Sequence, residues 1–294
     1  MWELIRSNIE LRNLWDLQLL FFFLMIYVLY LIATGPYKKD FTGSTKVHPV
    51  KKIVFFIGLL LAYLGFGGPL YFLGHIFFSV HMTQMAICFI IAPPLIIYGM
   101  PRWLFQAIPN VIRFNRVVRL CKDPLFSLIA FNALFSIYHL PQVFDFMMVN
   151  YHLHHLYNIV LFLTSLMTWY IMLQSNRLSN LQKTGYIFGS GLLLTPACAL
   201  IIFSSHPLYA TYSNPEFWAK VMGLCVMPGT HMPENFYDMI MPLSLVEDQH
   251  LGGVLMKIIQ EVVYGVALGY VFFQWMKKER QDEIDGVYPS VHNN

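Results

Sequence analysis

The chain has 294 residues, of which 57% are hydrophobic and only 12% charged, and its formal net charge is +3. Soluble domains carry about 25% charged residues, so this composition excludes an ordinary soluble protein and indicates an integral membrane protein. We therefore expect the lipid bilayer as a partner and no nucleic acid.

Seven apolar segments, each about long enough to cross a bilayer as a helix, follow one another along the chain. Their approximate bounds are 15–34, 53–73, 76–98, 124–140, 152–173, 185–205 and 253–276. They predict an all-α membrane protein, a seven-transmembrane-helix bundle that forms a single domain over residues 1–276. An outer loop over 206–249 and a cytoplasmic polar tail over 277–294 complete this topology. Within the loop, a short helix is predicted from Pro215 to about Met227, as a lid over the bundle.

The lysine and arginine residues predict the orientation of the bundle. Fifteen of the 19 lie in the tail or in the loops after spans one, three and five. Only Arg6, Arg12, Lys220 and Lys257 fall on the other side. Because cytoplasmic loops are enriched in basic residues, this alternation places the N-terminus outside and the C-terminus in the cytoplasm.

The third span carries polar and sulfur-containing residues on one helical face. His81, Gln84, Met85 and Cys88 stand at i, i+3, i+4 and i+7. Imidazole, thioether and thiol groups are ligands that a soft ion such as Cu(I) prefers. In the alternative interpretation, Met85 and Cys88 are ordinary core residues and His81 is a hydrogen-bonded buried histidine.

Histidines gather at the span ends that the basic residues place outside. Nine of the 11 lie there: His75, His81, His139, His152, His154, His155, His206, His231 and His250. They predict an outward-facing metal site, with the candidate ligands His75, His81, Met85, His139, His152, His155 and His250. Interfacial hydrogen bonding is the alternative role, and we favour it for His154, His206 and His231. The prediction rests on this distribution, because the chain has no metal motif of fixed spacing.

Polar residues at helical spacing support the predicted site. In span four, a stripe rises to the outer end through Asn132, Ser136 and His139. In span five, the stripe comprises His152, His155 and Asn158, with His154 turned away. Polar groups at membrane depth usually face the interior of a bundle or an aqueous cavity, so these stripes are expected to face inward.

The last span places His250, Lys257, Glu261 and Tyr264 on one face. Lys257 and Glu261 are one helical turn apart and can neutralise each other. The alternative for Glu261 is a role in proton or metal transfer, and the sequence leaves both open.

Three motifs resemble the CtaG family of bacterial cytochrome c oxidase assembly factors. The first is His81-Met82-x-Gln84, followed by Pro93-Pro94-Leu95 and Gly99-x-Pro101. The second is Tyr138-His139-x-Pro141, and the third is Asp248-Gln249-x-Leu251-Gly252-Gly253-x-x-Met256. The chain departs from the family pattern at Met85, where many members have a second histidine, and this favours a softer site that prefers Cu(I).

The resemblance implies a non-enzymatic protein of the bacterial cell membrane that is needed to mature a haem–copper oxidase. The expected cargo is copper as Cu(I), and the expected partners are the catalytic subunit of the oxidase and an extracytoplasmic copper chaperone. One alternative is a copper-transporting permease, which would need ligands through the full depth of the membrane. Another is a membrane redox protein that binds haem through paired histidines such as His81 and His155. A retinal protein, suggested by Lys257, is disfavoured because this lysine lies near the outer end of its span.

Overall fold

The computed structural model describes residues 14–111, 123–225 and 243–287, and within these ranges the chain is helical, without strands. Six helices are long and apolar enough to cross a bilayer, and a bent pair of helices can form a seventh span. The predicted bundle of seven transmembrane helices is therefore confirmed. Part of the predicted basic loop, the end of the predicted lid helix, His231 and the last seven residues of the tail lie outside the described residues.

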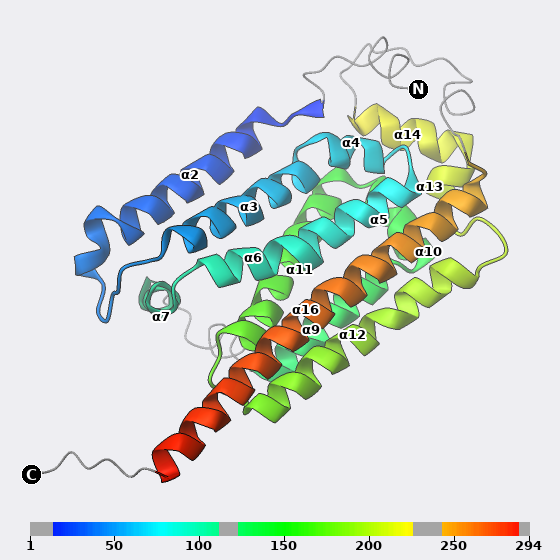
Figure 1. Cartoon of the computed structure of the whole chain (residues 1–294). Helices are drawn as coiled ribbons and strands as arrows, with labels where there is room; N and C mark the ends of the chain where they lie inside the picture. Colours follow the sequence, from blue (N-terminus) through cyan, green and yellow to red (C-terminus); the bar gives the residue numbers. More distant parts are fainter. Residues whose placement is uncertain (1–13, 112–122, 226–242, 288–294) are drawn as a thin grey trace, which may run out of the picture.

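The bundle is arranged around the third span (Figure 1). In its most apolar window 67% of the residues are buried, more than in any other span of the described chain. The loops after spans one, three and five and the end of the last helix, which carry the described basic residues other than Lys220 and Lys257, lie at one end of the bundle, here called the basic end. The opposite end holds His75, His81, His139 and His154 and is called the histidine end. The predicted separation of the two groups is thus found in the structure.

The first two long helices form one edge of the bundle. They are α2 (Leu17–Thr34) and α3 (Pro49–Phe66). The Tyr30 ring stacks on Phe55 with centroids 4.1 Å apart, and the Tyr30 hydroxyl donates a hydrogen bond to the carbonyl of Gly99 at 2.9 Å. This bond ties α2 to the basic end of the third span.

The predicted second span, 53–73, is in fact two helices. α3 ends at Phe66, and the short helix α4 (Pro69–Gly74) begins two residues after Gly67. Proline lacks a backbone N–H and disfavours helical conformation in the residue before it, which explains the break before Pro69. Before α3, a 3-10 turn (Pro36–Asp40) follows α2.

The third span is continuous but irregular. It comprises α5 (Phe78–Ala86), a π-helical segment (Ile87–Ile91) and α6 (Ala92–Gly99). Pro93 cannot donate a hydrogen bond to the carbonyl of Phe89, and the hydroxyl of Ser165 donates to that carbonyl instead, at 2.6 Å. Within a membrane such a group must find a partner inside the protein. Beyond Pro101, α7 (Arg102–Val111) begins the basic loop.

The fourth span bends sharply at the histidine end. α9 (Pro124–Tyr138) and α10 (Pro141–Met148) meet at an angle of 79°. The bend falls at His139 and Leu140, directly before a proline, where helical backbone is disfavoured. It turns α10 across the end of the bundle.

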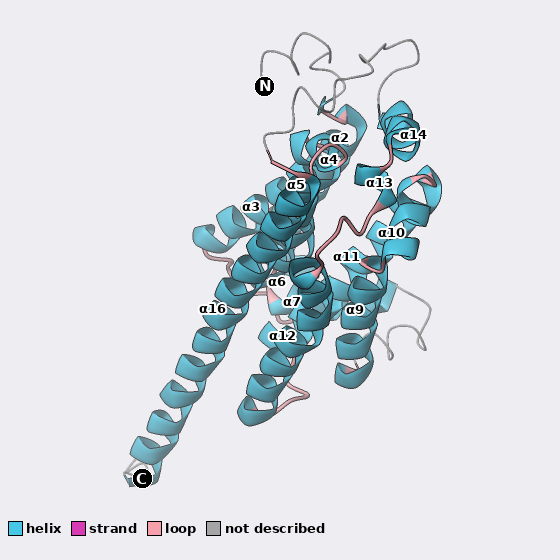
Figure 2. Cartoon of the chain, turned by 90° about the vertical axis from the view of Figure 1, so that its right-hand side faces the viewer, coloured by secondary structure: helices cyan, strands magenta, loops and turns pink. Residues whose placement is uncertain are grey.

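Two long helices and two short ones follow. They are α11 (Tyr151–Leu173), α12 (Asn180–Phe203), α13 (Ala210–Ser213) and α14 (Pro215–Cys225). Trp218 and Met222 of α14 pack against an apolar cluster that includes Phe72, Ile76 and Phe77. The predicted helix in the outer loop therefore exists and covers part of the histidine end (Figures 1 and 2).

The last helix, α16 (Leu245–Val287), is longer at both ends than the predicted span 253–276. It begins inside the predicted outer loop because two reciprocal hydrogen bonds cap its N-terminus. The backbone N–H of Ser244 donates to the carboxylate of Glu247 at 2.9 Å, and the backbone N–H of Glu247 donates to the hydroxyl of Ser244 at 3.3 Å. It continues into the predicted tail because the residues from Lys277 to Gln281 are good helix formers. Hydropathy detects only the part of this helix that lies in the bilayer. α16 packs against α12 and α5, and its C-terminal end extends beyond the bundle (Figure 1).

Candidate metal site

The polar face of the third span is fixed by the last helix. The carboxylate of Asp248 accepts hydrogen bonds from the backbone N–H groups of Phe78 at 2.7 Å and Ser79 at 3.3 Å, and so caps α5. A Cβ atom at Gly252 would lie only 3.0 Å from side-chain atoms of Met82 and Phe78, so the two helices touch closely here. The motif that begins at Asp248 therefore sets the position of His81.

Two buried histidines each carry an imidazole nitrogen without a hydrogen-bond partner. His81 is 2% exposed and His139 is 0% exposed, and the Nε2 atom of each is buried and unpartnered. The Nδ1 of His139 lies 2.7 Å from the carbonyl oxygen of Phe135. Because a carbonyl oxygen only accepts, Nδ1 must carry the proton, and the Nε2 of the neutral ring keeps its lone pair for a ligand. A buried polar atom without a partner costs about 1–3 kcal/mol.

Both rings pack against Tyr138. The centroid of the His81 ring lies 6.0 Å from that of Tyr138, and the centroid of His139 lies 5.3 Å from it. Phe144 of α10 also packs against His81, with ring centroids 5.0 Å apart. The 79° bend after α9 thus brings three segments, α5, the end of α9 and α10, around one small volume.

Two more histidines extend this group. The Nε2 of His154 lies 3.0 Å from the hydroxyl of Tyr138, and the ring centroids of His154 and His75 are 6.1 Å apart. The Nδ1–H of His75 donates to the carbonyl of Tyr71 at 2.7 Å. Burial lowers the pKa of His75 to about 4, so its ring is neutral at neutral pH. The four residues His75, His81, His139 and His154 are called the histidine cluster below.

The prediction that His154 turns away is wrong. The buried stripe of α11 runs through His154, Asn158, Leu161 and Ser165, because this face packs on the third and fourth spans. The spacing of the polar residues His154, Asn158 and Ser165, at i, i+4 and i+11, was the signal for this face. His152 of the predicted stripe is exposed instead.

Three predicted ligands lie away from the unpartnered nitrogens. His152 is exposed. His155 is half-buried, with Nε2 3.4 Å from the hydroxyl of Tyr71 and its ring against Tyr151. His250 donates from Nε2 to the carbonyl of Ser204 at 2.8 Å, because Asp248 and Gln249 occupy the inward face of α16. His250, predicted as a metal ligand, therefore has the hydrogen-bonding role that was the alternative.

The sulfur-containing residues of the third span are buried. Met82 and Met85 are both almost fully enclosed, and Met85 stands one helical turn from His81. Cys88 lies a further turn toward the basic end and is a free thiol. Gln84 donates from Nε2 to the carbonyl of Gly65 at 2.8 Å, which joins α5 to the end of α3. Among the described residues, no three His, Cys, Asp or Glu side chains are placed to hold one metal ion.

The histidine end is closed by α13. The carboxylate of Asp145 accepts from the backbone N–H groups of Ala210 at 3.0 Å and Thr211 at 2.8 Å. The hydroxyl of Tyr209 donates to the carbonyl of His139 at 2.9 Å, and burial raises the pKa of Tyr209, which keeps it a donor. These bonds hold α13 directly over the histidine cluster.

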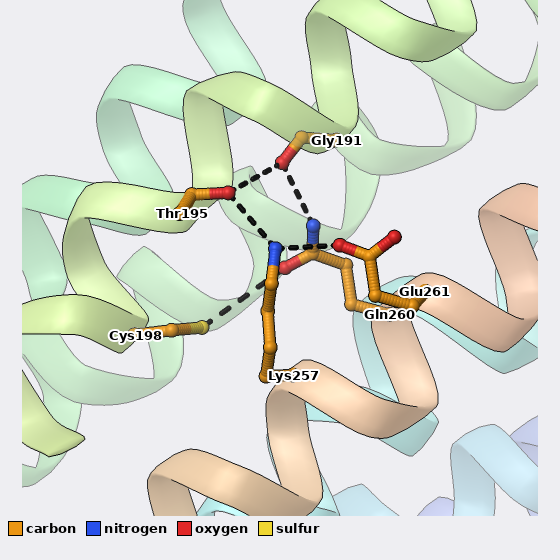
Figure 3. A network of polar contacts seen from close by, with 6 residues as sticks. All are labelled: Gly191, Thr195, Cys198, Lys257, Gln260 and Glu261. Carbon is orange, nitrogen blue, oxygen red and sulfur yellow. Dashed lines mark hydrogen bonds and ion pairs between the residues drawn. The ribbon is translucent and has the colours of Figure 1, made fainter.

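The polar residues of the last helix form a separate network (Figure 3). Lys257 pairs with Glu261 at 2.6 Å and also donates to the hydroxyl of Thr195 at 2.9 Å. Gln260 donates to the carbonyl of Gly191 at 2.8 Å and fixes α16 on α12. The predicted ion pair exists, but the stripe was wrong in part: Gln260 and Tyr264 face inward, while the Glu261 side chain is 64% exposed.

Fold and site together define a multi-pass helical membrane protein with a buried histidine cluster at one end of its bundle. The chain belongs to the cytochrome c oxidase caa3 assembly factor family (Caa3_CtaG), whose model matches residues 28–278. This match confirms the resemblance that the motifs indicated. No curated protein and no solved structure matches the chain.

Proposed function

We propose that this assembly factor holds Cu(I) between the Nε2 atoms of His81 and His139 and delivers it to the catalytic subunit of the oxidase. One observation carries the proposal: both nitrogens are buried and unpartnered, and both rings pack against the same tyrosine. Burying two such nitrogens is costly unless each finds a partner. Imidazole binds copper well, and the thioether of Met85 favours the reduced ion.

The coordination that we propose suits transfer of the ion. Two imidazoles with a weak thioether hold an ion less firmly than a closed tetrahedral site, so a partner with more ligands can take it over. His75 and His154 lie beside this pair and offer a route by which the ion reaches or leaves it. The donor in this scheme is an extracytoplasmic copper chaperone. No step requires the protein to make or break a covalent bond, and we therefore propose a role without catalysis.

The orientation of the bundle supports delivery from the outer face. Most of the described basic residues, all but Lys220 and Lys257, lie toward the end opposite the histidine cluster. By the positive-inside rule, the histidine cluster then faces the extracytoplasmic side. A permease would need ligands along the whole path through the membrane. Below the histidine cluster, the third span instead offers only Cys88 among strong copper ligands.

Titration with Cu(I) tests this proposal. The purified protein in detergent is titrated against a chromophoric Cu(I) chelator, and we expect it to withdraw about one ion per chain at submicromolar affinity. The double variant His81→Ala/His139→Ala should lose this binding. The control His152→Ala/His250→Ala removes two histidines away from the unpartnered nitrogens and should keep it. Equal binding by both variants would contradict the proposal, and an absorption band of bound haem in the purified protein would favour the redox alternative.

A further inference from the structure

A polar cavity lies at the basic end of the bundle, far from the histidine cluster. Its volume is about 260 Å³, and three of its lining residues are Lys51, Arg102 and Lys183. No lining residue is acidic in the part of the chain that the structure describes. A single water needs only about 10–15 Å³, so the cavity can hold a group of several atoms.

The three cations come from three different elements that are fixed to one another. Lys51 is in the first turn of α3, Arg102 begins α7 and Lys183 is in the first turn of α12. Gln174, which also lines the cavity, donates from Nε2 to the carbonyls of Ile97 and Met100, and so joins the end of α11 to the end of α6. The cavity is thus part of the packed bundle.

Among the described residues, no carboxylate forms a salt bridge with these three cations. The ion pair of Lys257 and Glu261 is the only salt bridge found among the described residues, and it lies on a different part of α16. Lys51 is held instead over the ring of Tyr98, 5.5 Å from its centroid. Arg102 and Lys183 are near enough to repel each other. Like charges that are gathered in one cavity without counter-charges favour the binding of an anion.

We propose that this cavity binds the phosphate group of an anionic phospholipid. Its residues lie at the ends of helices that cross the bilayer, which is the level of the lipid headgroups. Tyr98 and Tyr270 also line it, with ring centroids 6.0 Å apart, and tyrosines at the membrane interface commonly contact headgroups. Basic pockets between transmembrane helices on the cytoplasmic side bind anionic headgroups. A free phosphate ion shares this chemistry and is the other possible source.

The proposal is independent of copper binding and can be tested on the purified protein. Native mass spectrometry would follow the binding of added phosphatidylglycerol and cardiolipin, with phosphatidylcholine as the neutral lipid. We expect the anionic lipids to bind and the variant Lys51→Gln/Arg102→Gln/Lys183→Gln to lose at least tenfold in affinity. The control Lys38→Gln/Lys39→Gln/Lys278→Gln removes the same charge from positions outside the cavity and should bind as the unaltered protein does.

Two further experiments distinguish a phospholipid from a free phosphate ion as the ligand and test the role of the positive charges. Inorganic phosphate that competes for the site at low millimolar concentration, with no preference for anionic lipids, would overturn the lipid assignment. The variant Lys51→Arg/Arg102→Lys/Lys183→Arg keeps the charges and should retain lipid binding, provided that its thermal unfolding matches that of the unaltered protein. Equal loss in the cavity variant and the control variant would overturn the proposal, because attraction by net charge alone would then explain the binding.

Discussion

The carboxylate of Asp248 lies 2.7 Å from the backbone nitrogen of Phe78, and this contact joins the start of the last transmembrane helix to the start of the third. Asp248 is 3% exposed, so the bond is shielded from water. Removing a buried partner of this kind leaves backbone donors unsatisfied at the end of a helix. The bond also positions the turn that carries His81, one turn further along α5.

We therefore expect Asp248→Ala to lower the free energy of unfolding by about 2 kcal/mol. Asp248→Asn keeps an acceptor oxygen and should lose less than half of that. Thermal unfolding in detergent measures both, with Glu283→Ala as a control at an exposed position of the same helix. If Asp248→Ala unfolds at the same temperature as the control, the cap does not stabilise the fold.

The close contact between α16 and its neighbours predicts different effects for glycines of the same helix. A Cβ at Gly253 would lie 2.7 Å from a side-chain atom of Ile202, whereas nothing lies within 4 Å of one at Gly265 or Gly269. Gly253→Ala should cost about 1–3 kcal/mol, because packed side chains must shift. Gly265→Ala should be neutral or slightly stabilising, since alanine favours helix over glycine. Equal unfolding temperatures for the two variants would show that the helices tolerate separation.

The hydroxyl of Ser165 replaces a hydrogen bond that Pro93 cannot make. Ser165→Ala should lower the free energy of unfolding by about 1–2 kcal/mol, because the carbonyl of Phe89 is left without a donor in an apolar interior. Thr184→Ala is the control, since that hydroxyl donates only to Asn180 of its own helix. Unfolding monitored by tryptophan fluorescence in detergent makes the comparison. A smaller effect for Ser165→Ala than for the control would mean that the π-helical segment needs no partner.

A double-mutant cycle distinguishes a structural role of the Lys257–Glu261 ion pair from a role in copper transfer. Lys257→Met leaves a carboxylate unpaired at membrane depth and should cost about 1–2 kcal/mol, part of which Lys257→Met/Glu261→Gln should restore. Stability is read from the unfolding temperature and function from oxidase activity in cells. If the double variant is stable but fails to mature the oxidase, Glu261 has a transfer role. If oxidase activity is fully retained, the two residues form a structural pair.

The sequence predicts the bundle because hydropathy and charge report directly on the bilayer, and the basic residues do gather at one end. It does not predict the inward face of α11, because His152, His154 and His155 are all polar and only packing decides which is enclosed. His154 is enclosed because its face of α11 packs on the third and fourth spans, where Tyr138 of α9 bonds to it. The sequence does not predict the ends of α16 for a different reason, because both extend beyond its apolar part. Ser244 caps the N-terminal extension, and charged residues that favour helix form the C-terminal one. Of the predicted ligands, His81 and His139 have a buried nitrogen without a hydrogen-bond partner. The pattern of one helix cannot reveal this, because it depends on how the helices pack.

The copper content of the oxidase tests the central claim most directly. A strain that lacks this protein is complemented with the unaltered chain, with His81→Ala/His139→Ala, or with His152→Ala/His250→Ala, and copper per haem is measured in the purified oxidase. We expect the first double variant to give a copper-poor oxidase that added copper restores, and the second to match the unaltered chain. Full copper loading with His81→Ala/His139→Ala, in a variant present at normal level, would contradict the claim that these two nitrogens carry the ion.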